Sequence, residues 1–152
     1  MAGRRTTAIW VGLSAALLTS LGPAAGAAEA GRVHLRLRAT PAGEVLTNGA
    51  GYVLLIFPRE GNSLALCRRI RSCLEDWPPV TTTGPPLAGR GVDANLIGTT
   101  PYRGRRLAVT YAGWPLHTYR FAYSARNSVL NIGIRQFGDR WDALGPAGQF
   151  VS

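Results

Sequence analysis

The sequence is poor in the side chains from which most catalytic and metal sites are built. Its 152 residues include two cysteines, two histidines and no lysine. His34 and His117 are too few for a metal-binding cluster without help from carboxylates, and no spacing suggests such a site. Ser124, Ser128 and the acidic residues form no recognisable nucleophile arrangement. The sequence therefore predicts no catalytic residue, no bound metal and no cofactor.

Positive charge is carried by arginine alone. All 17 basic residues are arginine, against eight acidic residues, which gives a net charge of +9. Without residues 1–27 the net charge is +7, and without Glu29 as well it is +8. Such a surface attracts anionic polymers, lipid headgroups or nucleic acid. The alternative is a solvated coat that keeps the protein soluble, and the scattering of the arginines favours that alternative.

Two groups of arginines are denser than the rest and are the candidate anion-binding residues. One group crowds the cysteines and the other lies between two apolar runs; together they are Arg68, Arg69, Arg71, Arg103, Arg105 and Arg106. If both groups lie on one face, they form a patch to which anions bind non-specifically and with strong salt dependence.

The first 30 residues have the layout of a secretory signal peptide. Arg4 and Arg5 precede an uncharged apolar run from Ala8 to Leu21, and small residues follow it. The run is shorter than the roughly 20 residues that span a bilayer, and no later segment could cross a membrane. No cysteine precedes Cys67, so an N-terminal lipid anchor is not expected. We expect a secreted protein, extracellular or periplasmic, with a single domain over 31–152.

The two cysteines, Cys67 and Cys73, lie within the segment CRRIRSCLEDWPP. In an exported chain two cysteines are most simply interpreted as one disulfide. Residues six apart in a helix rise about 9 Å, beyond the roughly 7 Å between Cα atoms that a disulfide tolerates. A helix over 68–77 therefore predicts that Cys67 precedes it and that Cys73 lies inside it. The alternative, a redox pair, lacks the usual Cys-x-x-Cys spacing.

Apolar patterning predicts a mainly β domain. Val33, Leu35 and Leu37 alternate with polar residues, and so do the residues of 107–111. GYVLLIF at 51–57 fits a central strand that Pro58 ends. We also expect a turn over 47–51, a strand over 115–121 with His117, Tyr119 and Phe121 on one face, and short strands near 141–144 and 149–151. Asp139 and Asp142 are interpreted as solvated turn acids.

An internal repeat is visible at an offset of about 60 residues. GYVLLIF at 51–57 aligns with GWPLHTY at 113–119, and Trp77 falls near the place of Trp141. We expect two similar antiparallel β repeats, about 44–99 and about 104–152, with a short helix at the cysteines. The large aromatic residues are interpreted as core, and an exposed strip of Trp and Tyr beside arginines would instead suit a glycan or polyanion.

These motifs, in this order, resemble the bacterial secreted-repeat proteins of unknown function, also described as predicted lipoproteins. The signature of that family is Tyr, any residue, an aromatic residue, two residues and then Asp. The resemblance covers nearly all of 44–152 and rests on 51–57, both cysteines, Trp77-Pro78-Pro79, 97–99, 113–119 and 136–141. It implies a secreted or envelope location and a duplicated fold, and it implies no reaction.

The chain departs from the signature in both copies. In the first copy Leu55, Phe57 and Glu60 occupy the three signature positions, and in the second the residues there are His117, Tyr119 and Ala122. We expect a non-catalytic protein that acts in binding or structure. The alternatives are an envelope protein that binds anionic polymers or lipid headgroups through arginine and, least favoured, a redox or hydrolytic enzyme.

Overall fold

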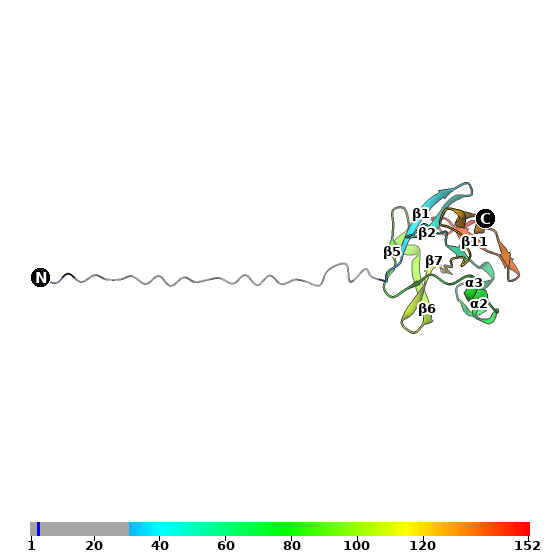
Figure 1. Ribbon diagram of the computed structural model, residues 1–152, viewed down its shortest axis with the longest axis horizontal. Helices are drawn as coiled ribbons and strands as arrows, with labels where there is room; N and C mark the ends of the chain where they lie inside the picture. Colours follow the sequence, from blue (N-terminus) through cyan, green and yellow to red (C-terminus); the bar gives the residue numbers. More distant parts are fainter. Residues whose placement is uncertain (1–2, 4–30) are drawn as a thin grey trace. The chain divides into compact units, whose positions relative to one another are not determined.

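The computed structural model describes residue 3 and residues 31–152 (Figure 1). The predicted signal peptide over 1–30 lies, apart from residue 3, outside the described residues. Residues 31–152 form one unit. In chain order its elements are β1 (His34–Thr40), β2 (Gly43–Asn48), β3 (Leu55–Ile56), the 3₁₀-helix η1 (Pro58–Glu60), α2 (Ala65–Arg69), α3 (Cys73–Asp76), β4 (Thr81–Thr82), β5 (Leu87–Ala88), η2 (Ala94–Leu96), β6 (Ile97–Arg103), β7 (Arg106–Tyr111), β8 (Trp114–Pro115), η3 (Asn127–Asn131), β9 (Arg135–Gln136), β10 (Asp139–Arg140), β11 (Asp142–Leu144) and β12 (Phe150–Val151).

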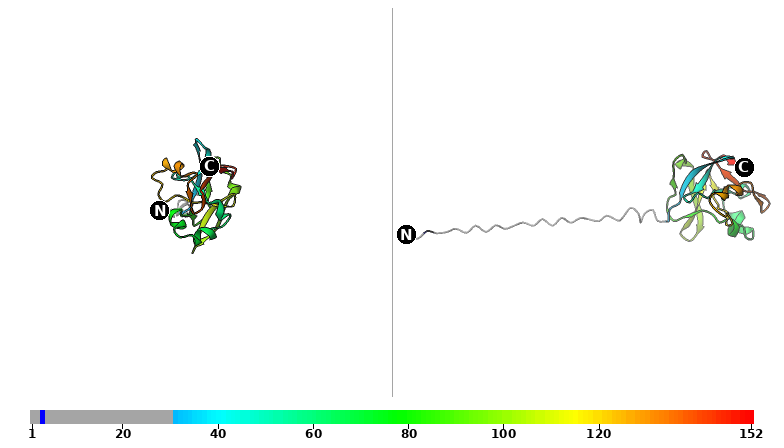
Figure 2. Two further views of the ribbon diagram at one scale, coloured as in Figure 1. Left: turned by 90° about the vertical axis from the view of Figure 1, so that its right-hand side faces the viewer. Right: turned by 45° about the horizontal axis from the view of Figure 1, so that its top comes forward.

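The prediction of a mainly β domain with a short helix at the cysteines is confirmed. Four small sheets have the strand orders β2-β1-β5, β10-β9, β12-β11-β3 and β4-β7-β6, with β8 also paired to β7. Nearly all of the pairs are antiparallel, and β1 with β5 is parallel. The strands surround the interior of the unit from several sides rather than forming one flat layer (Figure 2).

Two hairpins of equal strand length form the ends of this arrangement. Adding 63 to the bounds of β1 and β2 gives the bounds of β6 and β7. In the first hairpin Leu37 pairs with Leu46, and in the second Thr99 pairs with Val109. Burial alternates over the first half of β1, as the period of two requires, whereas residues 45–47 of β2 and 108–111 of β7 are buried on both faces.

The central pairing joins the segments that follow the two hairpins. Leu55 and His117, 62 positions apart, exchange backbone hydrogen bonds of 2.9 and 2.8 Å. On the outer side of this pair Leu55 lies opposite Ala143, and His117 lies opposite Pro79. The pairing of Leu55, in the first half, with Ala143, in the second, therefore corresponds to the pairing of His117, in the second half, with Pro79, in the first. Two-fold symmetry between the halves would produce such exchanged contacts. The duplication stays a prediction, and this pairing supports it.

The strands of the two matched segments are shorter than expected. Instead of running over 51–57 and 115–121, they reduce to β3 and β8, with isolated pairings at Val53 and His117. Beyond His117 the chain stays extended and antiparallel to 76–80, where the amides of Thr118 and Arg120 donate to the carbonyls of Pro78 and Asp76, and it then turns over 119–122. Phe121 is consequently exposed and does not share a buried face with His117 and Tyr119.

Two further sequence expectations need correction. The turn expected over 47–51 is narrower, because β2 extends to Asn48 and the turn occupies the residues that follow it. Asp142, expected to be a solvated turn acid, is buried in β11, where the guanidinium of Arg140 and the hydroxyl of Ser152 donate to its carboxylate.

The cysteine segment forms two short helices rather than one. Cys67 lies inside α2 and Cys73 begins α3, so the expectation that Cys67 precedes the helix is wrong. Ser72 has a φ of 66°, a left-handed conformation that breaks the helix between the cysteines. This break brings the two Cα atoms to 5.3 Å, and the predicted disulfide Cys67–Cys73 is present.

The interior holds two groups of buried side chains. The first is mainly aliphatic and lies between the hairpins; it includes Leu35, Leu46, Leu54, Val109 and Leu116, with Tyr111 as its buried aromatic residue. The second contains the disulfide and most of the buried aromatic rings; it includes Phe57, Cys67, Cys73, Trp77 and Trp141. The residues that resemble the family signature belong to the second group or border it.

Candidate functional site

Four aromatic rings form a continuous stack at the centre of the second group. Trp77 and Trp141 stack with their ring centroids 4.0 Å apart and their planes 6° apart. Phe57 stacks on the outer side of Trp141 at 4.7 Å, and Tyr119 covers the outer side of Trp77 at 4.4 Å. Each tryptophan therefore packs against the aromatic residue of the other sequence copy. Both tryptophans are fully buried, which confirms their interpretation as core.

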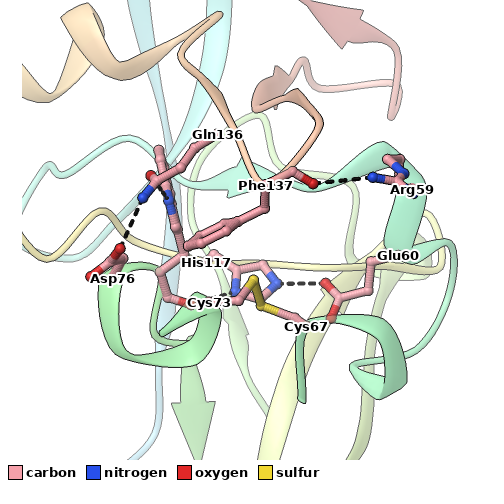
Figure 3. Close-up of a disulfide and its surroundings, with 9 residues drawn as sticks. Arg59, Glu60, Cys67, Cys73, Asp76, His117, Gln136 and Phe137 are labelled. Atoms are coloured by element: carbon pink, nitrogen blue, oxygen red, sulfur yellow. Dashed lines mark hydrogen bonds and ion pairs between the residues drawn. A yellow bond between two sulfur atoms is a disulfide. The ribbon is translucent and has the colours of Figure 1, made fainter. Parts of the chain in front are cut away.

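The two tryptophans differ in their hydrogen bonds. The indole N–H of Trp77 donates to Oε1 of Gln136 at 2.7 Å, and Nε2 of Gln136 donates to the carboxylate of Asp76 at 2.9 Å (Figure 3). The buried indole N–H of Trp141 has no hydrogen-bond partner among the described residues. A buried donor without a partner costs free energy. The hydrogen bond of the indole N–H therefore stabilises Trp77, and Trp141 has no such contribution.

A buried polar pair lies between the aromatic stack and η1. Nε2 of His117 and Oε2 of Glu60 are 2.9 Å apart, and the side chains are 0% and 1% exposed (Figure 3). Nδ1 of His117 lies 2.8 Å from the carbonyl oxygen of Trp77, and the imidazole stands nearly perpendicular to the ring of Trp141, with the ring centroids 5.2 Å apart. The pair therefore joins the last signature position of the first copy to the first signature position of the second.

The hydrogen-bond roles in this pair follow from its chemistry. A carbonyl oxygen only accepts, so Nδ1 of His117 carries a proton. One further proton then lies between Nε2 and the carboxyl group of Glu60, which gives either an imidazolium with a carboxylate or two neutral groups. Because both side chains are buried, the pair does not meet a substrate from solvent in this structure. Its geometry suits a link between the two halves of the domain.

The disulfide segment brings the two candidate arginine groups together. The guanidinium of Arg68 in α2 donates to the carbonyl oxygens of Pro101 and Tyr102, at 3.3 and 2.9 Å, near the end of β6. The ring of Tyr102 lies 5.8 Å from the guanidinium carbon of Arg68 and 5.2 Å from that of Arg103. Figure 1 shows α2 beside the free end of the β6 hairpin. The ring of Tyr102 thus lies against one arginine from each group.

Two adjoining hollows open beside these arginines. The first, of about 440 Å³, is lined by Arg68 and Arg69 together with residues of α2 and β6. The second, of about 380 Å³, is lined by Arg68, Arg71 and Arg103, with Glu75 as the acidic residue in its wall. We call this region the arginine surface and define it by Arg68, Arg69, Arg71, Tyr102 and Arg103.

The remaining two candidates lie elsewhere on the second hairpin. Arg105 is exposed at the turn between β6 and β7. Arg106 lines a separate hollow of about 180 Å³ with Gly31 and the threonines of 81–83. The prediction from sequence did not include Tyr102 in the arginine surface. Its position directly before Arg103 was the available signal, because an arginine that stacks on an aromatic ring is a recurrent contact.

Other kinds of site find little support in the described residues. No three side chains of His, Cys, Asp or Glu within them gather closely enough to hold a metal ion. No helix in that part of the chain is long and apolar enough to cross a bilayer. His34, the second histidine, is exposed at the start of β1 and has no role in the polar pair.

Comparison with known proteins identifies no relative: no family model, no curated protein and no solved structure matches the chain. The resemblance to the secreted-repeat proteins therefore rests on the motifs themselves.

Proposed function

We propose that this protein is a secreted or cell-envelope protein with a non-catalytic binding role, and that its arginine surface binds anionic groups of envelope polymers. The observation that carries the proposal is the contact of Arg68 with Tyr102 and Pro101, which joins the arginines of the cysteine segment to Arg103. An anion in the second hollow would meet guanidinium groups from two separate elements, Arg68 of α2 and Arg103 of β6.

The fixed position of Arg68 favours binding. A guanidinium that is already held by two carbonyl oxygens and an aromatic ring loses less conformational freedom when an anion binds than a free side chain does. Guanidinium groups also match the paired oxygens of phosphate and carboxylate groups. The net charge of +7 or +8 expected for the exported chain increases attraction at longer range.

Export is supported by two independent features. The predicted signal peptide has the required layout, and the Cys67–Cys73 disulfide belongs to an oxidising compartment. Two positions that depart from the signature of the secreted-repeat family also support the proposed membership, because their side chains contact each other. Glu60 and His117, which replace Asp and Tyr there, make one polar pair across the two copies.

The test compares two triple variants of equal charge. Arg69→Ser, Arg71→Ser and Arg103→Ser remove three exposed arginines of the arginine surface, and the control triple removes exposed arginines elsewhere: Arg36, Arg90 and Arg135, each to Ser. Both are applied to immobilised heparin at low salt, and the salt concentration needed for elution is measured. We expect the first triple to elute at clearly lower salt than the control, because released counterions make binding scale with the contacts made.

Equal shifts in the two triples would contradict the proposal and would leave the arginines as a solubility coat. Absence of heparin binding by the wild-type protein at low salt would contradict it as well. Unfolding in urea checks that each variant retains the stability of the wild-type domain.

A further inference from the structure

A loop that follows the central pairing exposes three large apolar side chains. Phe121 is 59% exposed, Tyr123 93% and Leu130 74%. We call residues 120–130 the apolar loop. An isolated apolar residue on a surface is ordinary, but several on one short segment mark a place where the protein meets a partner.

The apolar loop is held in one conformation by the body of the domain. The guanidinium of Arg38, in β1, donates to the carbonyl oxygens of Ala125 and Arg126 at 2.6 and 2.9 Å. The hydroxyl of Ser128 donates to the carbonyl of Ala125 at 2.6 Å and accepts from the amide of Val53 at 2.9 Å. The backbone of the loop is thus fixed while its apolar side chains face solvent.

The charges along this part of the chain are of one sign. No acidic residue occurs from residue 94 to residue 138, and within the apolar loop Arg120 and Arg126 are both exposed. The guanidinium of Arg120 lies 5.4 Å from the centre of the Phe121 ring. The amide of Arg120 donates to the backbone carbonyl of Asp76, and the carboxylate of Asp76 accepts a hydrogen bond from Gln136. The partner that fits is apolar beneath an anionic surface.

We propose that the apolar loop docks the protein on an anionic lipid bilayer. Phe121, Tyr123 and Leu130 enter the boundary between headgroups and acyl chains, where aromatic side chains with one polar end are favoured. Arg120 and Arg126 remain at the level of the lipid phosphates, to which their charge attracts them. The apolar loop shares no residue with the arginine surface, so separate variants test the two proposals independently.

The first test measures binding to phosphatidylcholine vesicles that contain phosphatidylglycerol. Replacing Phe121 and Tyr123 with serine should weaken binding about tenfold or more, because both side chains then have no apolar area to bury. The control is Phe150→Ser, which removes an exposed aromatic side chain from β12. It should bind like the wild-type protein. Part of the wild-type binding should survive molar salt, which screens charges but strengthens apolar burial, and that part should be lost in the double variant.

The second test places a reporter in the loop. Phe121→Trp should shift its fluorescence to the blue and be quenched by brominated lipid in the same vesicles, whereas Tyr102→Trp on the arginine surface should not. Heparin elution of the loop variants should be unchanged, which separates this proposal from the previous one. Vesicle binding without quenching at position 121 would overturn the proposal, as would a blue shift that depends on protein concentration and needs no lipid, because it would identify a second copy of the chain as the partner.

Discussion

The buried pair of Glu60 and His117 predicts a large, non-additive effect on stability. Their side chains are 1% and 0% exposed, so replacing either one leaves the other buried without its partner. Breaking a buried pair in this way typically costs about 3–5 kcal/mol. A domain of this size is stable by about 5–15 kcal/mol, so Glu60→Ala or His117→Leu alone should lower the urea midpoint substantially.

The double variant, with both changes, should cost much less than the two single changes together. It removes both polar groups and places at this site the residue types that the matched signature positions already hold, Leu55 and Ala122. Replacing a buried pair by apolar side chains is often close to neutral, although removing the Glu60 side chain also leaves some space unfilled. The expected coupling energy is therefore at least about 2–3 kcal/mol, at the upper end of what residues in contact show.

Urea unfolding, followed by tryptophan fluorescence, measures the free energy of unfolding for the wild-type protein and the three variants. The reasoning fails if the single variants cost less than about 1 kcal/mol each and add in the double variant, because such additivity is the behaviour of independent sites. It also fails if the double variant is as unstable as the two single costs combined predict. An unchanged dependence on urea concentration across the set shows that all four proteins unfold in the same way.

Three further predictions concern the same core and its surroundings. Trp141→Ala should cost about 3–5 kcal/mol, but Trp141→Phe should cost less than Trp77→Phe in the same urea assay, because only the indole N–H of Trp77 has a hydrogen-bond partner. Replacing Cys67 and Cys73 by alanine should cost about 2–3 kcal/mol by the loop-entropy estimate for so short a loop, and alkylation followed by mass spectrometry of the non-reduced protein should find no free thiol. Burial, together with the carboxylate of Asp93, raises the pKa of the Tyr111 phenol above its usual value, although a hydrogen bond from the Asp93 amide opposes this. The unfolded chain then loses this proton first, so the stability that Tyr111 contributes is present below about pH 10 and is lost as the pH rises through the higher folded pKa; a urea midpoint that does not fall in that range would contradict the assignment.

Much of the fold could be predicted from local pattern. The alternation at Leu35 and Leu37 and over 107–111 identified strands of both hairpins, but 108–111 of β7 are buried on both faces, which the alternation did not predict. The expectation of export and the presence of only two cysteines predicted the disulfide. These features depend on residues that are neighbours in sequence, so a single sequence carries the information.

Other features depended on contacts that the sequence does not display. The run over 115–121 has the alternation of a strand and stays extended beside 76–80 as far as Arg120, but a turn closed by the amide of Ala122 on the carbonyl of Tyr119 leaves Phe121 exposed. The helix over 68–77 was expected to be continuous. Instead, Ser72 adopts a left-handed conformation between α2 and α3, the two helices that the disulfide joins. In both places local propensity alone did not determine where the element ends.

The signature positions show why an apparent loss in sequence need not be a loss in structure. Taken copy by copy, Leu55 with Glu60 and His117 with Ala122 both look degenerate, since each copy lacks part of the pattern. In the fold, however, Glu60 meets His117 of the other copy, 57 positions away. Two of the four positions therefore hold one polar pair, and the other two, Leu55 and Ala122, are both apolar.

A buried position tolerates a change of polarity only when its partner changes with it, because a lone buried polar group costs more than a pair or than none. If the pairing of Leu55 with His117 relates the two halves by two-fold symmetry, Ala122 has the same position relative to Leu55 as Glu60 has relative to His117. The combination His117→Leu with Glu60→Ala would then make the two halves alike at these positions, and its near-neutral effect on stability would follow from the same rule that already accounts for Leu55 and Ala122.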